Sequence, residues 1–152
     1  MNPILAGAPW LIAHKSMLGV NKPHKITLNA NDYVLWQNQK GEVFALDNVC
    51  PHMQAPLSNG WICKQRNTIT CPFHALEFDG EGKLYREGKA DGQSIAKPLK
   101  LIVVDDCIWT YGGFAPKIPW RIPASLYACS STAAKRTEDS TKLDSDLFRI
   151  WN

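Results

Sequence analysis

Two short motifs that combine cysteine and histidine constrain this chain more than any other feature. The first is Cys50-Pro51-His52, and the second is Cys71-Pro72-Phe73-His74. Thiolates and imidazoles are metal ligands, and mixed pairs of them on two separate loops are typical of a metal site. A single Cys or His is usually a packed residue, but four at this spacing favour metal binding. The proline after each Cys fixes φ and removes a backbone donor, which suits a stiff loop around a metal.

Two kinds of metal centre compete for these side chains. Two thiolates on one iron and two imidazoles on another describe a Rieske-type 2Fe-2S cluster, whereas a Cys₂His₂ set also describes tetrahedral zinc. Zinc fingers usually pair Cys with Cys, and His with His on a following helix, but each motif here is mixed. The pattern therefore favours the iron–sulfur cluster, with a zinc-stabilised binding module as the distant alternative. The predicted metal ligands are Cys50, His52, Cys71 and His74.

The composition limits the size and the partners of the protein. A chain of 152 residues suits one domain with a real core. Its net charge of +3 is mild and no basic stretch follows a helical face, so nucleic-acid binding is not indicated. Residues 1–9 contain neither a basic start nor an apolar stretch that could act as a signal or cross a bilayer. We therefore expect a soluble, cytoplasmic protein without a membrane span.

Three of the five cysteines lie outside the two motifs. Cys107 falls in an apolar strand pattern and is predicted to be a small core residue. Cys63 is predicted to be a packed or half-exposed thiol in the loop between the motifs, and Cys129 lies near the C-terminus. A disulfide framework is not expected in a cytoplasmic protein, and none of the three is predicted to be catalytic.

Short β-type runs alternate with turn signals from about residue 25 to 111, and no helical pattern of useful length competes with them. For residues 10–18 the pattern leaves a helical turn and an edge strand open. The sequence predicts an all-β domain, an antiparallel β-sandwich or partly open barrel with a small cluster-binding lobe at about residues 47–80. The predicted strands are 25–28, 33–36, 43–46, 68–70, 76–78, 83–85, 101–104 and 108–111.

The character of the chain changes after Gly113. Three prolines punctuate the segment that follows, and small polar and mixed charged residues come after them. We predict a domain over residues 1–119 and an irregular, disordered tail over residues 120–152.

From Trp10 to Pro119 the chain resembles the N-terminal Rieske domain of the large subunit of non-haem iron aromatic-ring-hydroxylating oxygenases. The resemblance implies that Cys50 and Cys71 bind the inner ferric iron and that His52 and His74 bind the outer, solvent-facing iron. It rests on Val34-Leu35-Trp36, Ala45 to His52, Ala55 to Ser58, Gly60, Cys71 to His74, Phe78-Asp79 and Gly82.

The chain departs from this family beside each motif. Met53-Gln54 follow the first His, where the family often has Arg-Gly. Ala75-Leu76 follow the second His, where the family often has Gly-Trp. These changes are expected to alter the rim of the cluster pocket and not its ligands.

Full-length members of the family carry a C-terminal domain that binds a mononuclear iron through two His and a carboxylate. No His follows His74 in this chain, so we predict no catalytic residue and no oxygen activation by the chain alone. Our first hypothesis is a one-electron relay domain of a truncated oxygenase. It would receive electrons from a reductase or ferredoxin and pass them to an oxygenase catalytic domain or subunit. The alternative is a stand-alone Rieske-type ferredoxin.

Overall fold

The computed structural model describes residues 7–117, which form an all-β fold. No α-helix occurs in this range, and two short 3-10 helices, η1 (Lys15–Met17) and η2 (Leu57–Asn59), are its only helical turns. The predicted all-β class is confirmed. The strands are β1 (Trp10–His14), β2 (His24–Leu28), β3 (Asn31–Gln37), β4 (Val43–Asp47), β5 (Trp61–Cys63), β6 (Thr68–Thr70), β7 (Glu77–Phe78), β8 (Lys83–Arg86), β9 (Lys89–Ser94), β10 (Ile102–Val104) and β11 (Cys107–Thr110).

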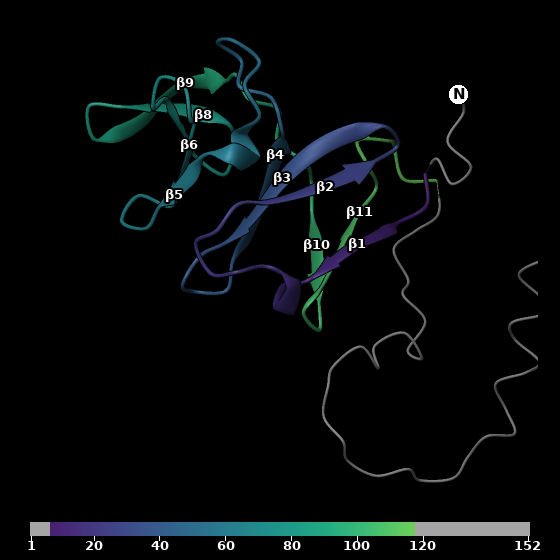
Figure 1. The fold of residues 1–152 in the computed structure, drawn as a ribbon. Helices are drawn as coiled ribbons and strands as arrows, with labels where there is room; N and C mark the ends of the chain where they lie inside the picture. The colour runs from purple at the N-terminus through teal and green to yellow at the C-terminus, as the bar shows by residue number, and fades with distance from the viewer. Residues whose placement is uncertain (1–6, 118–152) are drawn as a thin grey trace, which may run out of the picture.

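The strands form three antiparallel sheets with the orders β1-β11-β10, β2-β3-β4 and β5-β6-β7-β8-β9. None of these sheets closes into a barrel within the described part of the chain. Figure 1 shows the five-stranded sheet at one end of the described domain. The sheet of β2, β3 and β4 lies next to it, and the sheet of β1, β11 and β10 lies on the far side. The predicted cluster-binding lobe corresponds to the loops at this end and to strands β5, β6 and β7.

Tight turns with left-handed backbone set the register of two hairpins. Asn29 and Ala30 connect β2 to β3 with φ values of 50° and 61°, and Asp105 and Asp106 connect β10 to β11 with 47° and 64°. Two consecutive positive φ values are the conformation of the two-residue turn whose twist matches antiparallel strands. The predicted strands 25–28 and 33–36 leave residues 29–32 as the connection. In the structure the turn is only Asn29 and Ala30, because Asn31 already pairs with Leu28 in the β2–β3 ladder.

Strand β3 joins the two hydrophobic clusters of the core. Successive side chains of a strand point to opposite faces. Val34 and Trp36 lie in the cluster that extends toward the five-stranded sheet, and Leu35 lies in the cluster shared with β1 and β11. All three side chains are completely buried. The sheet that contains β3 thus anchors the predicted metal loops to the rest of the domain.

The structure resolves two points that the pattern left open or missed. Residues 10–18 contain both alternatives, since β1 is followed directly by η1. The sequence does not predict strands β5 and β9. Strand β5 is a three-residue segment that pairs with β6, and β9 is a polar, glycine-containing segment whose extended form comes from pairing with β8. Cys63 therefore lies in a strand and not in a loop. The predicted tail at 120–152 and Cys129 lie outside the described residues.

Candidate metal centre

The first cysteine motif forms a compact loop, residues 50–55, that we call the first loop. The backbone N–H of Cys50 donates to the carbonyl of Ala55 at 2.8 Å, and the N–H of Gln54 donates back to the carbonyl of Cys50 at 2.8 Å. These two bonds close the loop at both ends. They satisfy backbone groups that burial of Cys50 would otherwise leave unpaired.

The second motif forms residues 71–76, the second loop, with the same pattern of hydrogen bonds. The N–H of Cys71 donates to the carbonyl of Leu76 at 2.8 Å, and the N–H of Ala75 donates to the carbonyl of Cys71 at 3.1 Å. In both loops the cysteine N–H reaches the fifth residue after it, and the fourth residue bonds back to the cysteine. The two loops are thus two copies of one backbone frame.

The fourth residue after each cysteine has left-handed backbone. The φ values are 58° at Gln54 and 53° at Ala75. Only glycine adopts this region without a penalty from its β-carbon. These are the two positions at which the family that the chain resembles often has Gly. The departures therefore affect the backbone energy of the loops, in addition to the predicted change at the rim of the pocket.

The two cysteine thiols of the loops lie inside the protein. Cys50 and Cys71 are each 1% exposed and belong to the same hydrophobic cluster as Trp36. Burial raises the pKa of the Cys50 thiol above its ordinary value; backbone N–H groups of His52 and Met53 oppose this shift, and the adjacent Cys71 thiol adds to it. A metal ion is the partner that would hold such a thiol in its deprotonated form.

The two motif histidines lie at the surface. His52 and His74 are both exposed, and their ring centroids are 4.8 Å apart with an interplanar angle of 79°. The Phe73 ring lies 6.3 Å from the His74 ring, also in an edge arrangement. The structure therefore brings the four predicted ligands together as two pairs, with the thiols buried and the imidazoles outside.

This arrangement fits a dinuclear cluster. A Rieske cluster takes two thiolates at one iron and two imidazoles at the other, which matches one buried and one exposed pair. A single zinc ion needs four ligands that converge on one point. Across residues 7–117, no three or more His, Cys, Asp or Glu side chains surround a common ion position. The donor set and its division into pairs favour the iron–sulfur cluster.

Buried polar and close backbone contacts support the first loop. Asn48 is 4% exposed, and its side-chain Oδ1 accepts the backbone N–H of Ser58 at 2.7 Å. This bond fixes the chain on both sides of residues 50–55. Gly60 lies so close to β6 that a β-carbon built on it would be 1.8 Å from the carbonyl oxygen of Thr70, the residue before Cys71. Gly60 thus allows the segment after the first loop to pack against the start of the second.

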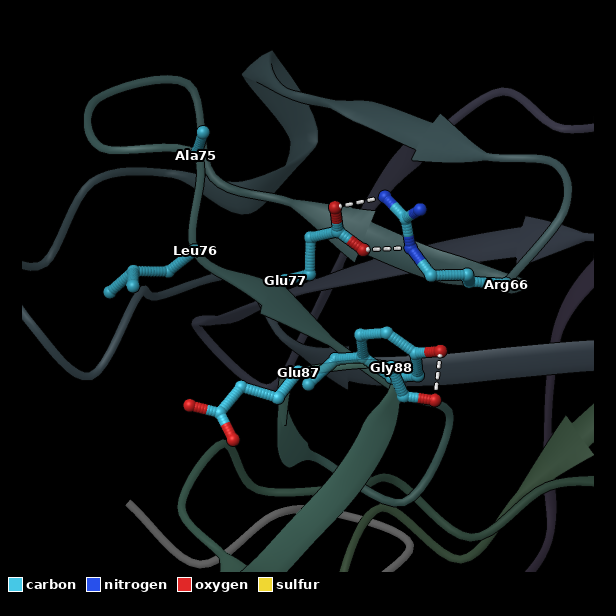
Figure 2. Close-up of a pocket in the computed structure, with 7 residues that line it drawn as sticks. Arg66, Ala75, Leu76, Glu77, Glu87 and Gly88 are labelled. Carbon is cyan, nitrogen blue, oxygen red and sulfur yellow. Dashed lines mark hydrogen bonds and ion pairs between the residues drawn. The ribbon is translucent and has the colours of Figure 1, made fainter.

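An ion pair supports the second loop. Glu77 follows Leu76 directly, and its carboxylate accepts from Arg66 Nε at 2.8 Å while its other oxygen pairs with Arg66 Nη2 (Figure 2). The hydroxyl of Thr68 donates to the same carboxylate at 2.7 Å. Chiefly through the hydrogen bond from Arg66, the pKa of Glu77 is lowered from its ordinary value of 4.5. The Arg66 guanidinium also lies 5.5 Å from the centroid of the Tyr85 ring.

A cavity of 560 Å³ opens beside this ion pair, and the end of the second loop lines it. Figure 2 shows Ala75 and Leu76 on one side, with Glu87 and Gly88 from the β8–β9 turn nearby. No sequence motif marks Arg66, Thr68 or Glu77 as part of this site. No local pattern connects them, because the pairing of β6 with β7 brings them together.

The comparison with protein-family models identifies the class. The model of the Rieske [2Fe-2S] domain matches residues 8–97, so this chain belongs to the Rieske [2Fe-2S] family and its cofactor is a Rieske-type 2Fe-2S cluster. Such a domain transfers electrons. None of the helices in residues 7–117 has the length and apolar character needed to span a membrane.

The particular relatives are oxygenase components and ferredoxins. The chain is 31% identical over 133 residues to the oxygenase component of dicamba O-demethylase from Stenotrophomonas maltophilia, which covers 84% of this chain and 38% of the relative. The structure of dicamba monooxygenase with non-haem iron and dicamba is 28% identical, with a TM-score of 0.66, over 81% of this chain and 38% of that one. The chain therefore spans less than half the length of these relatives.

A ferredoxin has the same fold at lower identity. The ferredoxin of carbazole 1,9a-dioxygenase from Nocardioides aromaticivorans is 22% identical, with a TM-score of 0.58, over 72% of this chain and 98% of the ferredoxin. This likeness shows the fold alone. Together the comparisons confirm the predicted homology to the N-terminal Rieske domain of ring-hydroxylating oxygenases, the fold class and the cofactor.

Proposed function

We propose that this domain is the electron relay of a Rieske oxygenase, with Cys50, Cys71, His52 and His74 as the cluster ligands. Electrons would come from a reductase or ferredoxin and go to a mononuclear iron held in an oxygenase catalytic domain or subunit. The observation that carries this proposal is the division of the ligands: two thiols at 1% exposure and two exposed imidazoles with ring centroids 4.8 Å apart.

Each part of this ligand set has a separate task. The cluster, when bound, supplies a one-electron redox couple. The thiols of Cys50 and Cys71 hold it against the apolar core, which excludes water. Backbone N–H groups of His52 and Met53 favour the deprotonated form of Cys50, and N–H groups directed at a cluster sulfur raise the potential of an iron–sulfur centre. The exposed imidazoles bring the electron to the surface, where a partner can approach.

A stand-alone Rieske ferredoxin is the second candidate. It is favoured by the fold of the carbazole dioxygenase ferredoxin, which this chain covers over 98% of its length. The relay is favoured by the higher identity to oxygenase components, 31% over 133 residues for dicamba O-demethylase. The two candidates share the cluster and differ only in the acceptor of the electron.

Metal analysis and spectroscopy test the shared part of the proposal. The purified protein should be red-brown and contain about two iron and two labile sulfide per chain, because the mixed ligand set requires a dinuclear centre. Stoichiometric zinc without visible absorbance would contradict it. Alone, the protein should accept and return an electron yet form no oxygen-dependent product.

The second part requires an acceptor assay. The dithionite-reduced protein, freed of excess dithionite, would be mixed with an intact dicamba O-demethylase oxygenase component and dicamba. A ferredoxin would support demethylation, because it delivers electrons to a complete oxygenase. A relay domain would not, and turnover in this assay would contradict the first candidate.

A further inference from the structure

We propose that electrons are exchanged through an uncharged, apolar contact formed by His52, Met53, Phe73 and His74, which we call the imidazole face. Its partner is a redox protein that offers an uncharged, apolar surface around its own centre. This inference rests on the proposed function, since it assumes that His52 and His74 hold the outer iron.

Two large apolar side chains are exposed beside the predicted outer ligands. Phe73 is 63% exposed and Met53 is 59% exposed, the highest values among the large hydrophobic residues from 7 to 117. Each is adjacent in sequence to one histidine, and the ring centroids of the two histidines are 4.8 Å apart. Exposed apolar side chains grouped around a functional site mark an interaction surface.

The loops that carry this face contain no charged side chain. Residues 48–63 and 67–76 include no Asp, Glu, Lys or Arg, although the whole chain has 17 basic and 14 acidic residues. Two charged residues, Lys64 and Arg66, lie between these stretches, and Arg66 forms an ion pair with Glu77. With neutral imidazoles, two thiolates and two sulfides balance the charge of two ferric ions, and the one-electron-reduced cluster carries a single negative charge. The two loops that form the imidazole face therefore contribute no charged side chain to it.

These properties select the chemistry of the partner. Contact with Met53 and Phe73 releases water from apolar surface, which is favourable. A charged partner surface would lose its hydration against this face without gaining an opposite charge, and that loss is costly. An apolar, uncharged partner surface gains the contact without this penalty. Association should therefore depend little on ionic strength.

A pair of lysine variants with ferricyanide as the oxidant tests the charge of the face. Stopped-flow absorbance would follow reoxidation of the reduced protein at increasing NaCl. The native rate should rise only moderately with salt, through the single negative charge of the reduced cluster. Met53→Lys should raise it by about tenfold at low salt, because a cation lies beside the trivalent anion, and salt should remove this gain. Leu11→Lys, at a 53% exposed site on the edge strand of another sheet, should leave it unchanged.

Two cobalt complexes of equal charge test the apolar part. Met53→Ser and Phe73→Ser should each slow oxidation by tris(phenanthroline)cobalt(III) by about threefold, because the aromatic ligands lose apolar contact. Oxidation by hexaamminecobalt(III), which has the same charge and no aromatic ligands, should not change. Leu11→Ser should affect neither rate.

The outcomes separate this inference from the proposed function. A native protein without two iron and two sulfide would overturn the proposed function. With the 2Fe-2S spectrum intact, a strong salt dependence of the native rate would overturn the inference alone. Equal effects of Met53→Lys and Leu11→Lys, or equal effects of the serine variants on both cobalt complexes, would also overturn it.

Discussion

The first and second loops have the same backbone frame but different supports. Both close through the cysteine N–H and the fourth residue after it, and both bury the thiol. The first loop is followed by a segment fixed through the buried amide of Asn48, whereas the second ends at the ion pair between Glu77 and Arg66. Equal frames explain why both thiols face the core. Different supports imply that acid and salt act mainly on the second loop.

The largest expected effect tests whether the two loops are equivalent. Cys50→Ser and Cys71→Ser should each abolish the 2Fe-2S absorbance, because each removes one of the two thiolates that the inner iron requires. Cys63→Ser should keep the cluster absorbance. Cys63 is a half-buried residue of β5, and its thiol donates a hydrogen bond to the side chain of Gln65. Visible spectra and iron content give the readout. A full cluster in one of the two variants would mean that its cysteine is not a ligand and that the two loops are not equivalent.

A smaller effect tests the contact between the loops. Gly60→Ala should lower the free energy of unfolding by about 3 kcal/mol, because its β-carbon would overlap the Thr70 carbonyl and force the backbone to shift. Gly19→Ala is the control, since its nearest neighbour is the flexible side chain of Lys22. Urea unfolding of both variants measures the difference. Equal stability of the two would mean that the loops do not depend on this close approach.

The support of the first loop can be removed without a change of charge. Asn48→Ala should lower the free energy of unfolding by about 1–2 kcal/mol, because it leaves the Ser58 N–H without its acceptor. Asn59→Ala, at an exposed neighbouring position, should have little effect. The loss in Asn48→Ala should be the same at low and high salt. A salt-dependent loss would contradict the assignment of a neutral support.

Loss of the support of the second loop should give the smallest effect on stability, and this effect should depend on pH. Glu77→Gln removes the ion pair with Arg66 and should lower the melting temperature by a few degrees at neutral pH. The pKa of Glu77 is lowered in the folded protein, so its contribution is present above the ordinary value of 4.5 and is lost as pH falls through the folded-state pKa. The difference between native and variant protein should therefore vanish in acid.

Glu81→Gln is the matched control for this variant. The pKa of Glu81 is also lowered by a basic partner, in this case Lys83. Glu81 lies in the β7–β8 turn and not at the end of the second loop. Thermal melts should show a similar pH trend for both variants, while the rate of cluster loss to a chelator should increase only for Glu77→Gln. Equal rates of cluster loss would argue that the ion pair has no role in holding the second loop.

The fold class could be predicted, and the four candidate metal ligands could be proposed, because their signals are local. The strands from β2 to β4 are short apolar or β-branched runs separated by turn signals, and the two motifs place each Cys near a His within four residues. The pairing of thiol with thiol and imidazole with imidazole follows from the same resemblance, and the structure brings the side chains into these pairs.

What could not be predicted depends on contacts between distant segments. Arg66 and Glu77 are eleven positions apart and meet only because β6 and β7 pair in a particular register. Strand β9 has no alternating pattern, and its pairing with β8 gives it its extended form. The equal backbone frames of the loops were also hidden, since they appear only in the hydrogen bonds.

The left-handed backbone at Gln54 and Ala75 limits which sequences these loops tolerate. Both residues are exposed, and exposed positions usually accept most substitutions. At φ near 55°, however, a β-branched residue such as Val is strongly disfavoured, while Gly and Asn are readily accommodated. Variation at positions 54 and 75 is therefore restricted by the backbone and not by the chemistry of the side chain. A screen of all substitutions at these two surface sites should be as selective as one in the core.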